Sequence, residues 1–427
     1  MPVVLDTRAD ITLDAFRRVA WRGESVRLSA AALACVAKAR QSFMALLDDP
    51  SIVVYGVTSG YGDRARVRLS PEERRAQART GTGNLRISFD APLPNRVARG
   101  MVLARLASMI EGNAAVRPEI AEAVASMLDG DPLPVVPGRG NGGAGEIVAL
   151  GHLFGGLGLE LEEKESVALV NGSPGSAALI ADATLAAQGR LRLAEEVFAL
   201  SIEALRAPLE AYAYELDELW GDPHEATALG RLRELLTGGT EERRAFQAPV
   251  SYRILPRVLG QAHRALAGAE RAATISLSEV SDNPIFVPPS ETAPTGQILS
   301  NGSYHNARAP AALDGLAGTW ADLCQLAERH TQRLRADPDA LGGVDVVPSP
   351  VTYLTMVQVA YTEEARASAQ RTALPAGGFE QDDVASTGFL AWGKEERTAG
   401  CLEAALAALA ASASQELHSN GRPAPPA

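Results

Sequence analysis

Long stretches rich in alanine and leucine constrain this chain more than any other feature. They run over about residues 176–205, 307–335, 353–372 and 389–417, and their apolar residues recur at helical spacing. Helices of this length cover their apolar stripes only by packing against other helices. A single short β-branched run, residues 51–54, indicates a strand. We therefore predict a mainly α-helical fold built around a bundle of long helices.

The positions of these stretches indicate how the chain is divided. We expect residues 1–175 to form a smaller N-terminal helical domain, with shorter helices over 95–111 and 117–128. Residues 176–418 would form the central bundle, and the Pro-rich end, 419–427, a disordered tail. The apolar helix faces exceed what one small core requires, so we also expect an oligomer.

Charge and cysteine usage narrow the function class. The net charge of −12 disfavours a nucleic-acid or anionic-membrane partner, because either needs a basic face. Cys35, Cys324 and Cys401 lie far apart, with neither a disulfide framework nor metal-ligand spacing. The start resembles no signal peptide, and no run of about 18 uninterrupted apolar residues occurs. We expect a cytoplasmic protein with no bound metal.

A glycine-rich loop, PGRGNGGAGEIVALGHL at residues 137–153, leads directly into an apolar helix. A phosphate-binding loop would end in Lys followed by Ser or Thr, whereas here Glu146 follows and would compete with a phosphate. The centre of the loop, residues 143–145, carries no side-chain heteroatom. From these residues alone, a turn that brings two backbones close together and a former reactive loop both stay open.

Six other blocks resemble, in the same order, motifs of the aromatic amino acid ammonia-lyases and aminomutases, the family of histidine, phenylalanine and tyrosine ammonia-lyases. The blocks are VYGVTSGYG at 54–62, ESVALVNGS at 165–173, FQAPVSYRILPRVLG at 246–260, EVSDNP at 279–284, ILSNGSYHNA at 298–307 and EQDDVASTG at 380–388. The resemblance implies a mainly helical homotetramer in which each pocket for a small-molecule substrate draws residues from three chains.

In this register the glycine-rich loop aligns with the family's G-A-S-G-D motif. There an Ala-Ser-Gly tripeptide cyclises and dehydrates to methylideneimidazolone (MIO), and the serine becomes its exocyclic methylene. Here the tripeptide is Gly143, Ala144 and Gly145, followed by Glu146. Alanine has no hydroxyl to lose as water, so we predict that the chain forms no MIO and uses no cofactor.

Three residues match the family's catalytic and binding positions. Tyr55 matches the catalytic tyrosine, and a phenol with a lowered pKa can act as a general base or acid. Arg253 matches the arginine that pairs with the substrate carboxylate, and Asn171 the asparagine beside the amino acid head group. A second family tyrosine is replaced by Val250, and whether the nearby Tyr252 takes its place stays open.

Five further positions are assigned to the substrate pocket by the same resemblance. Tyr304 stands where the family has an aromatic residue beside the substrate, and Gln381 and Asp382 stand at an amide and acidic position. The pair that selects the substrate side chain aligns with Gln77 and Ala78. Because these two are polar and small, they disfavour an aromatic substrate.

The expected function is a lyase-like reaction that does without MIO. Tyrosine acid/base chemistry would drive elimination, conjugate addition, isomerisation or cyclisation of a small carboxylate-bearing, amino-acid-derived substrate. One alternative is a catalytically inactive family member that binds a ligand or a partner subunit. Another is an engineered, cofactor-less variant of an ammonia-lyase or aminomutase. The joint presence of Tyr55, Asn171 and Arg253 favours the enzyme.

Overall fold

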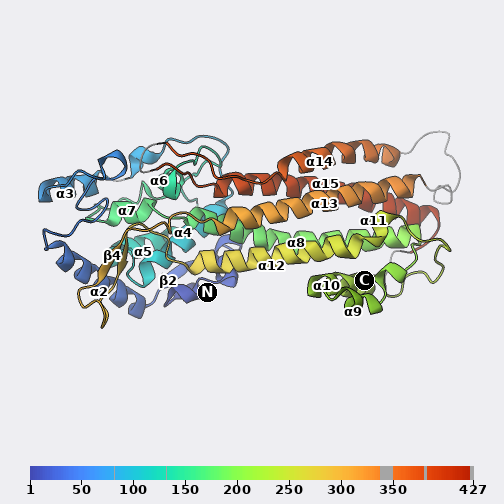
Figure 1. The fold of residues 1–427 in the computed structure, drawn as a ribbon, viewed down its shortest axis with the longest axis horizontal. Coiled ribbons are helices and arrows are strands. Elements are labelled where there is room, and N and C mark those ends of the chain that lie inside the picture. Colours follow the sequence, from blue (N-terminus) through green and yellow to red (C-terminus); the bar gives the residue numbers. More distant parts are fainter. Residues whose placement is uncertain (81, 131, 337–349, 379–381, 424–427) are drawn as a thin grey trace. The chain divides into compact units, whose positions relative to one another are not determined.

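The structure is a computed structural model that describes residues 1–80, 82–130, 132–336, 350–378 and 382–423 (Figure 1). It divides into two compact units, each assembled from three segments of the chain. Unit 1 comprises Met1–Asp182, Glu270–Ala311 and Thr372–Trp392, and unit 2 comprises Ala183–Ala269, Ala312–Arg371 and Gly393–Ala427. The expected contiguous domains, 1–175 and 176–418, differ from this division because the four longest helices each contribute residues to both units.

Unit 1 consists of short helices and two small sheets. Its helices are α1 (Leu13–Phe16), α2 (Ala30–Leu47), α3 (Pro71–Arg79), α4 (Asn95–Ile110), α5 (Pro118–Ser126), α6 (Ile147–Phe154) and α7 (Glu165–Val170). The strands are β1 (Val3–Leu5), β2 (Val26–Leu28), β3 (Ile285–Val287) and β4 (Gln297–Leu299). β1 pairs with β2 in parallel, and β3 pairs with β4 antiparallel, with Phe286 opposite Ile298.

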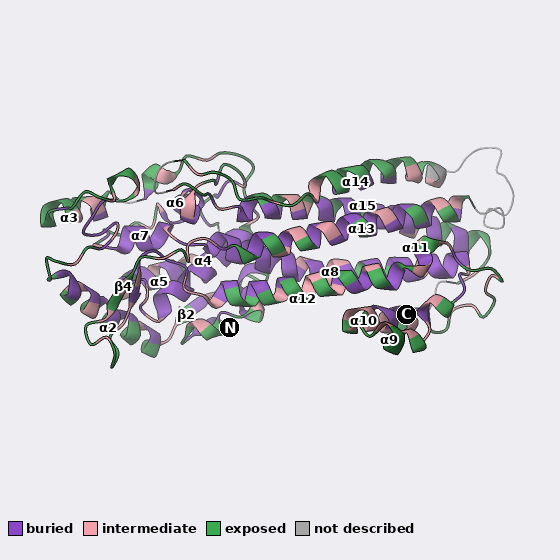
Figure 2. Cartoon of the chain, in the orientation of Figure 1, coloured by how far each residue is buried: buried purple, intermediate pink, exposed green. Residues whose placement is uncertain are grey.

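The core of unit 1 forms around α4. Every residue of this helix from Val97 to Ile110 is buried, including two arginines (Figure 2). Arg99 donates from Nε to the Val19 carbonyl at 2.8 Å, so its charge is solvated by backbone oxygen instead of water. A helix that is buried on all sides needs other elements around it, and α2, α5 and the 3₁₀ and π turns near the N-terminus supply them.

By length and composition, α2 (Ala30–Leu47) is apolar enough to cross a membrane. In the structure its Phe43 is fully buried in a hydrophobic cluster that includes Val54. Its Arg40 is also buried and donates to the Ala115 carbonyl at 3.0 Å. These contacts assign α2 to the core of unit 1.

Unit 2 contains most of the long-helix bundle. Its elements, some of which begin in unit 1, are α8 (Pro174–Leu205), α9 (Glu215–Trp220), α10 (Pro223–Leu236), α11 (Val250–Arg253), α12 (Leu255–Ser278), α13 (Arg308–Arg335), α14 (Leu354–Ser368) and α15 (Gly388–Ser419). The long helices run side by side in Figure 1. The mainly α-helical bundle predicted from periodicity is confirmed, and so are the helices expected over 95–111, 176–205, 307–335 and 389–417.

Two local expectations were wrong. Residues 51–54 form no strand, because the Val54 N–H donates to the Thr58 hydroxyl at 2.7 Å and the Val54 carbonyl accepts from Val57, which closes a tight turn. The described part of the expected tail, 419–423, is anchored: Arg422 donates to the Glu203 carbonyl at 3.0 Å, at the C-terminal end of α8. Residues 424–427 lie outside the described part.

The aromatic contact at the centre of the unit 1 cluster gives a stability prediction. Phe43 is fully buried and meets Phe286 edge-on, with ring centroids 5.5 Å apart. Phe43→Ala should lower the free energy of unfolding in urea by about 3–5 kcal/mol, because it removes buried apolar area and leaves a cavity. Phe89→Ala is the matched control, since Phe89 is 88% exposed, and should change it by about 0.5 kcal/mol or less. Equal effects of the two substitutions would contradict this assignment of the core.

Candidate functional site

A cavity of about 290 Å³ lies within unit 1. Its wall combines polar and apolar side chains and is assembled from segments far apart in the sequence. The lining residues are Tyr55, Tyr61, Gly62, Thr82, Asn84, Leu85, Ala144, Ile147, Ser166, Val167, Val170, Asn171, Asn283, Ser300, Asn301, Tyr304 and Asp382. Five residues that the family resemblance singles out, Tyr55, Ala144, Asn171, Tyr304 and Asp382, therefore meet at one cavity.

Tyr55 is held at the cavity by the turn that follows α2. Gly56 adopts a positive φ of 69°, which glycine tolerates at no steric cost, and the Gln77 amide donates to the Gly56 carbonyl at 3.0 Å. The Tyr55 hydroxyl oxygen accepts from the Gly62 N–H at 3.1 Å. Its own proton is thus available to another acceptor.

The Tyr55 pKa is raised, whereas the match to a catalytic tyrosine predicted a lowered one. Burial is the largest cause, and the nearby Asp382 carboxyl adds to it, while the Gly62 N–H opposes it. In this chain alone, the phenol is therefore neutral near pH 7. It is a proton donor first and becomes a base only when a positive charge is brought close to it.

The tripeptide loop is held in a conformation that requires its glycines. Gly143 and Gly145 have φ values of 117° and 68°, which side-chain-bearing residues rarely adopt. The Gly143 carbonyl accepts from the Ser386 N–H at 2.9 Å, and the Gly145 carbonyl from the Gly172 N–H at 3.2 Å. A Cβ on Gly145 would come within 2.9 Å of the Asn171 Oδ1. The loop is thus pressed against the Asn171 side chain, with Ala144 on the cavity wall.

Glu146 anchors this loop to the start of α8. Its buried carboxylate accepts from the Gly175 N–H at 2.6 Å and from the Ser176 N–H at 2.8 Å, and the Ser176 hydroxyl donates to it as well. These amides have no partner within the helix, so the carboxylate serves as a cap and complements the helix dipole. Burial nevertheless raises the pKa of Glu146 to about 7, against the lowering effect of these hydrogen bonds and of Arg105.

Asn171 ends α7 and presents its side chain to the cavity. Its backbone carbonyl accepts from the Arg105 Nη1 at 2.6 Å. Its Oδ1 is buried and has no hydrogen-bond partner in the described part of the chain. An orphaned buried acceptor costs free energy, and a ligand with an N–H or O–H donor would satisfy it.

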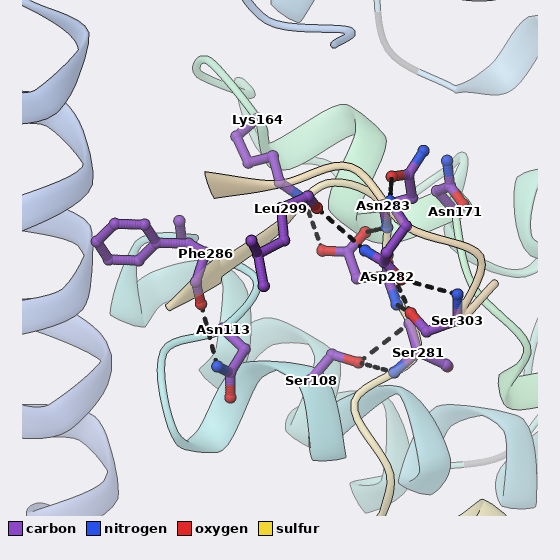
Figure 3. Close-up of polar contacts among 12 residues, drawn as sticks. Ser108, Asn113, Lys164, Asn171, Ser281, Asp282, Asn283, Phe286, Leu299 and Ser303 are labelled. Carbon is purple, nitrogen blue, oxygen red and sulfur yellow. Dashed lines mark hydrogen bonds and ion pairs between the residues drawn. The ribbon is translucent and has the colours of Figure 1, made fainter. Parts of the chain in front are cut away.

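A buried polar network supports the wall from behind (Figure 3). Lys164 and Asp282 form an ion pair at 2.6 Å, and both side chains are fully buried. The Ser303 hydroxyl donates to the Asp282 carbonyl at 2.8 Å, and the Asn301 N–H donates to the Asn283 Oδ1 at 2.9 Å. These bonds fix the segments that carry Asn283, Asn301 and Tyr304 to the wall. Sequence reasoning missed Lys164, because the acidic and basic run around it is typical of a solvated surface.

The remaining predicted residues do not line this cavity. Gln77 holds the Tyr55 turn from outside it, and Ala78 is buried. Arg253 belongs to unit 2, where its Nε donates to the Ala248 carbonyl at 2.9 Å. Gln381 lies outside the described residues. Their assignment to substrate binding stays a prediction.

Asp382 is the single carboxyl group among the described lining residues. Its pKa is raised, first by burial and then by the neighbouring Asp63 and Asp383 carboxylates. A carboxyl with a raised pKa beside a neutral phenol gives the cavity two groups that can exchange protons with a ligand.

Comparison with known proteins identifies this architecture. The family model for aromatic amino acid lyases matches residues 11–158 and 158–426. The chain belongs to the aromatic amino acid lyase family. It is 31% identical over 374 residues to the histidine ammonia-lyase of Deinococcus radiodurans, covering 80% of this chain and 70% of that protein. With the histidine ammonia-lyase of Streptomyces coelicolor it shares 28% identity over 426 residues, 90% of this chain and 82% of the relative.

Solved structures show the same fold. The tyrosine aminomutase from Streptomyces globisporus superposes with a TM-score of 0.86 at 24% identity, covering 99% of this chain and 89% of that one. The phenylalanine aminomutase of Pantoea agglomerans superposes with a TM-score of 0.88 at 18% identity, over 99% and 91% of the two chains. These structures share the fold of this chain over nearly its whole length.

The buried carboxyl of Glu146 predicts a pH dependence of stability. Its pKa rises from 4.5 in the unfolded chain to about 7 in the fold, so the folded protein holds this proton more tightly. The stabilisation is complete below about pH 4.5 and is lost as the pH rises through about 7. Relative to Glu146→Gln, which cannot ionise, the wild type should lose about 2–3 kcal/mol of unfolding free energy between pH 5 and pH 8.

Urea unfolding at pH 5, 6, 7 and 8 measures this difference. Glu165→Gln is the control: Glu165 is buried and paired with Arg117, and its pKa is lowered, so it stays ionised throughout this range. Glu165→Gln should lower the free energy of unfolding by the same amount at each pH. A difference between wild type and Glu146→Gln that does not change from pH 5 to pH 8 would contradict the assignment.

Proposed function

We propose that this member of the aromatic amino acid lyase family is a lyase-like enzyme that works without MIO. One observation carries the proposal: Ala144, on the cavity wall with Tyr55 and Asp382, occupies the centre of the tripeptide loop. Formation of MIO eliminates water from a side-chain hydroxyl at that position, and a methyl group has none. The residues present therefore do not fit this prosthetic group, and no step of the proposed mechanism uses it.

Loss of the electrophile limits which substrates the site accepts. Deamination of an ordinary amino acid removes a β-proton of very low acidity. General acid/base catalysis by a side chain supplies about 10²- to 10⁴-fold, whereas enzymes typically accelerate reactions by 10⁶-fold or more. The proposed substrate is therefore a small, amino-acid-derived carboxylate whose C–H bond is already acidic. A carbon next to a thioester, a ketone or a conjugated alkene meets this requirement.

The protonation states support a division of roles. Tyr55, neutral near pH 7, would donate its proton to the leaving group of an elimination or to the carbon of a conjugate addition. Asp382 would take the proton from the carbon or from the nucleophile, and the two groups would then exchange one proton to return to their starting states. Isomerisation and cyclisation use the same pair, with removal and return of a proton at different atoms.

Binding groups complete the proposed site. The unpartnered Oδ1 of Asn171 would accept a hydrogen bond from a donor on the substrate. Arg253 would grip the carboxylate with its planar guanidinium, which suits two parallel hydrogen bonds.

We also propose a homotetramer in which each pocket is shared between chains. Large apolar side chains are exposed on α14, among them Met356, Val357 and Val359 (Figure 2). Exposed apolar faces of this kind favour association. Arg253, in unit 2, would then be supplied to the cavity by another copy. The proposal includes a cytoplasmic location and no bound metal.

Intact mass tests the absence of MIO. Since maturation removes two waters, the denatured chain should have the mass of the unmodified sequence, and a proteolytic peptide that spans residues 137–153 should be unmodified too. A peptide lighter by two waters would refute the proposal and restore amine release from an ordinary amino acid as the favoured reaction.

Tyr55→Phe tests the acid/base assignment. Purified protein is screened by mass spectrometry against small acyl thioesters, β-keto acids and conjugated carboxylates, each with and without an amino group. Tyr55→Phe should lower the turnover found by about 10²-fold or more, because it removes the proton donor. Tyr214→Phe, a change to a tyrosine that is exposed in unit 2, should not alter it.

Binding separates the alternatives. Ligand-observed NMR measures which carboxylates the protein binds. If wild type and Tyr55→Phe bind the same carboxylate equally well and neither turns it over, the protein is a catalytically inactive family member and the enzyme hypothesis is wrong. Full turnover by Tyr55→Phe would instead remove Tyr55 from the mechanism. If the chain is an engineered, cofactor-less variant of an ammonia-lyase or aminomutase, Ala144→Ser should restore MIO and amine release.

A further inference from the structure

Arg253 lies on a single turn of helix that ends one residue before the long helix α12. α11, Val250–Arg253, has four residues, and Tyr252 is its one buried residue. Val250, at its start, is 58% exposed, and Ile254, which follows it, is also exposed. A single turn of helix is not stable by itself. The direction of the Arg253 side chain therefore depends on what holds Tyr252, together with the buried Leu255 at the start of α12.

Tyr252 is held by aromatic stacking. Its ring lies parallel to the imidazole of His330 on α13, with centroids 3.6 Å apart and an interplanar angle of 7°. Phe198 of α8 packs edge-on against the other ring of the pair, His330, at 5.1 Å. All three side chains are fully buried. The stack thus clamps the one buried residue of α11 between the long helices.

Hydrogen bonds fix the orientation of the same ring. The Ser201 hydroxyl lies 3.1 Å from the Tyr252 hydroxyl and 3.0 Å from the His330 Nδ1, so it bridges them. The Tyr212 hydroxyl donates to the Tyr252 carbonyl at 2.9 Å. The tyrosine next to Arg253 is therefore fixed at both its side chain and its backbone.

The charge state of His330 suits this bridge. Burial lowers the pKa of the imidazole to about 3, and the Ser251 carbonyl opposes this only in part. A neutral imidazole lets Nδ1 accept the Ser201 proton, and the Ser201 oxygen can then accept from the Tyr252 hydroxyl. Removal of the Ser201 hydroxyl would therefore take this hydrogen bond from both the Tyr252 hydroxyl and the His330 Nδ1.

We propose that Tyr252, His330 and Ser201 are positioning residues that fix Arg253 for carboxylate binding. They act through α11 and touch no substrate. The Arg253 Nε is already committed to the Ala248 carbonyl, at 2.9 Å, which leaves the two terminal nitrogens of the guanidinium to face a ligand. A guanidinium held at its Nε and anchored through the preceding residue loses little freedom when it binds a carboxylate. The inference rests on the proposed function.

The test uses chemical labelling, which needs no substrate. The folded full-length protein is treated with phenylglyoxal, and the labelling rate of each arginine is followed by peptide mass spectrometry. His330→Phe keeps a ring in the stack but removes the bond to Ser201, and Tyr252→Leu removes the ring. Each should speed labelling of Arg253 about five-fold or more, because loss of a buried hydrogen bond or stack favours local opening of α11.

Controls separate positioning from general loosening. Cys324→Ala, another buried change on α13, should leave the Arg253 rate unaltered, and Arg231 and Arg264, elsewhere in unit 2, should keep their rates in every variant. The proposal is overturned if Arg253 is labelled at the wild-type rate in both variants, or if all these arginines accelerate together. If His330→Phe or Tyr252→Leu does not fold, Ser201→Ala gives the same measurement with a smaller change.

Kinetics then distinguish this inference from the proposed function. With the substrate found through Tyr55-dependent turnover, both His330→Phe and Arg253→Lys should raise KM more than they lower kcat. Suppose that His330→Phe and Tyr252→Leu speed the labelling of Arg253 but leave KM unchanged. Tyr252 and His330 would then hold Arg253 in place, but Arg253 would bind no carboxylate. The positioning network would then stand, and the proposed role of Arg253 would not.

Discussion

The cavity depends on a buried arginine in α4. Arg105, in the fully buried α4, donates to the Asn171 carbonyl and to the Ser281 carbonyl, both at 2.6 Å, and to the Ser108 hydroxyl at 2.9 Å. Burying a guanidinium away from water costs free energy unless carbonyl or carboxylate oxygens replace the lost hydration. α4 therefore pins α7 and the segment after α12 at fixed positions, and Asp282 provides a compensating negative charge. The wall that carries Asn171 and Asn283 follows from this arrangement.

Periodicity and motifs predicted different parts of this structure. The helical repeat in the sequence was sufficient to predict the long helices. The six motif blocks, in their family order, were sufficient to predict that Tyr55, Asn171 and Asp382 lie at one cavity. Neither signal predicted Arg105. An arginine within an apolar helical pattern resembles a residue at the edge of a stripe, and its burial depends on carbonyl partners 66 and 176 residues away. The discontinuous units escaped prediction for the same reason, since long-range packing defines them.

The structure gives Gln77 a contact that its position in the family motif did not predict. Its alignment with the family's substrate-selecting pair indicated a side chain in the pocket. In the structure its amide donates to the Gly56 and Ser59 carbonyls, at 3.0 and 3.4 Å. A glutamine is long enough either to enter the pocket or to bond a neighbouring turn, and the sequence contains no information on which carbonyls lie within reach. Polarity at the cavity comes from other residues, among them Asn84 and Asn301.

The polar groups on the cavity wall help to decide whether the protein is an enzyme or a non-catalytic member of the family. Among the amides that line the cavity, the Asn171 Oδ1 is a buried acceptor with no hydrogen-bond partner in the described part of the chain, so only water or a ligand can satisfy it. Each unsatisfied buried group costs about 1–3 kcal/mol, which apolar residues of similar size would avoid. A chain kept only for its fold has no physical reason to retain that cost. Together with a tripeptide loop held in its strained backbone by Glu146, this favours a site that binds and processes a polar molecule.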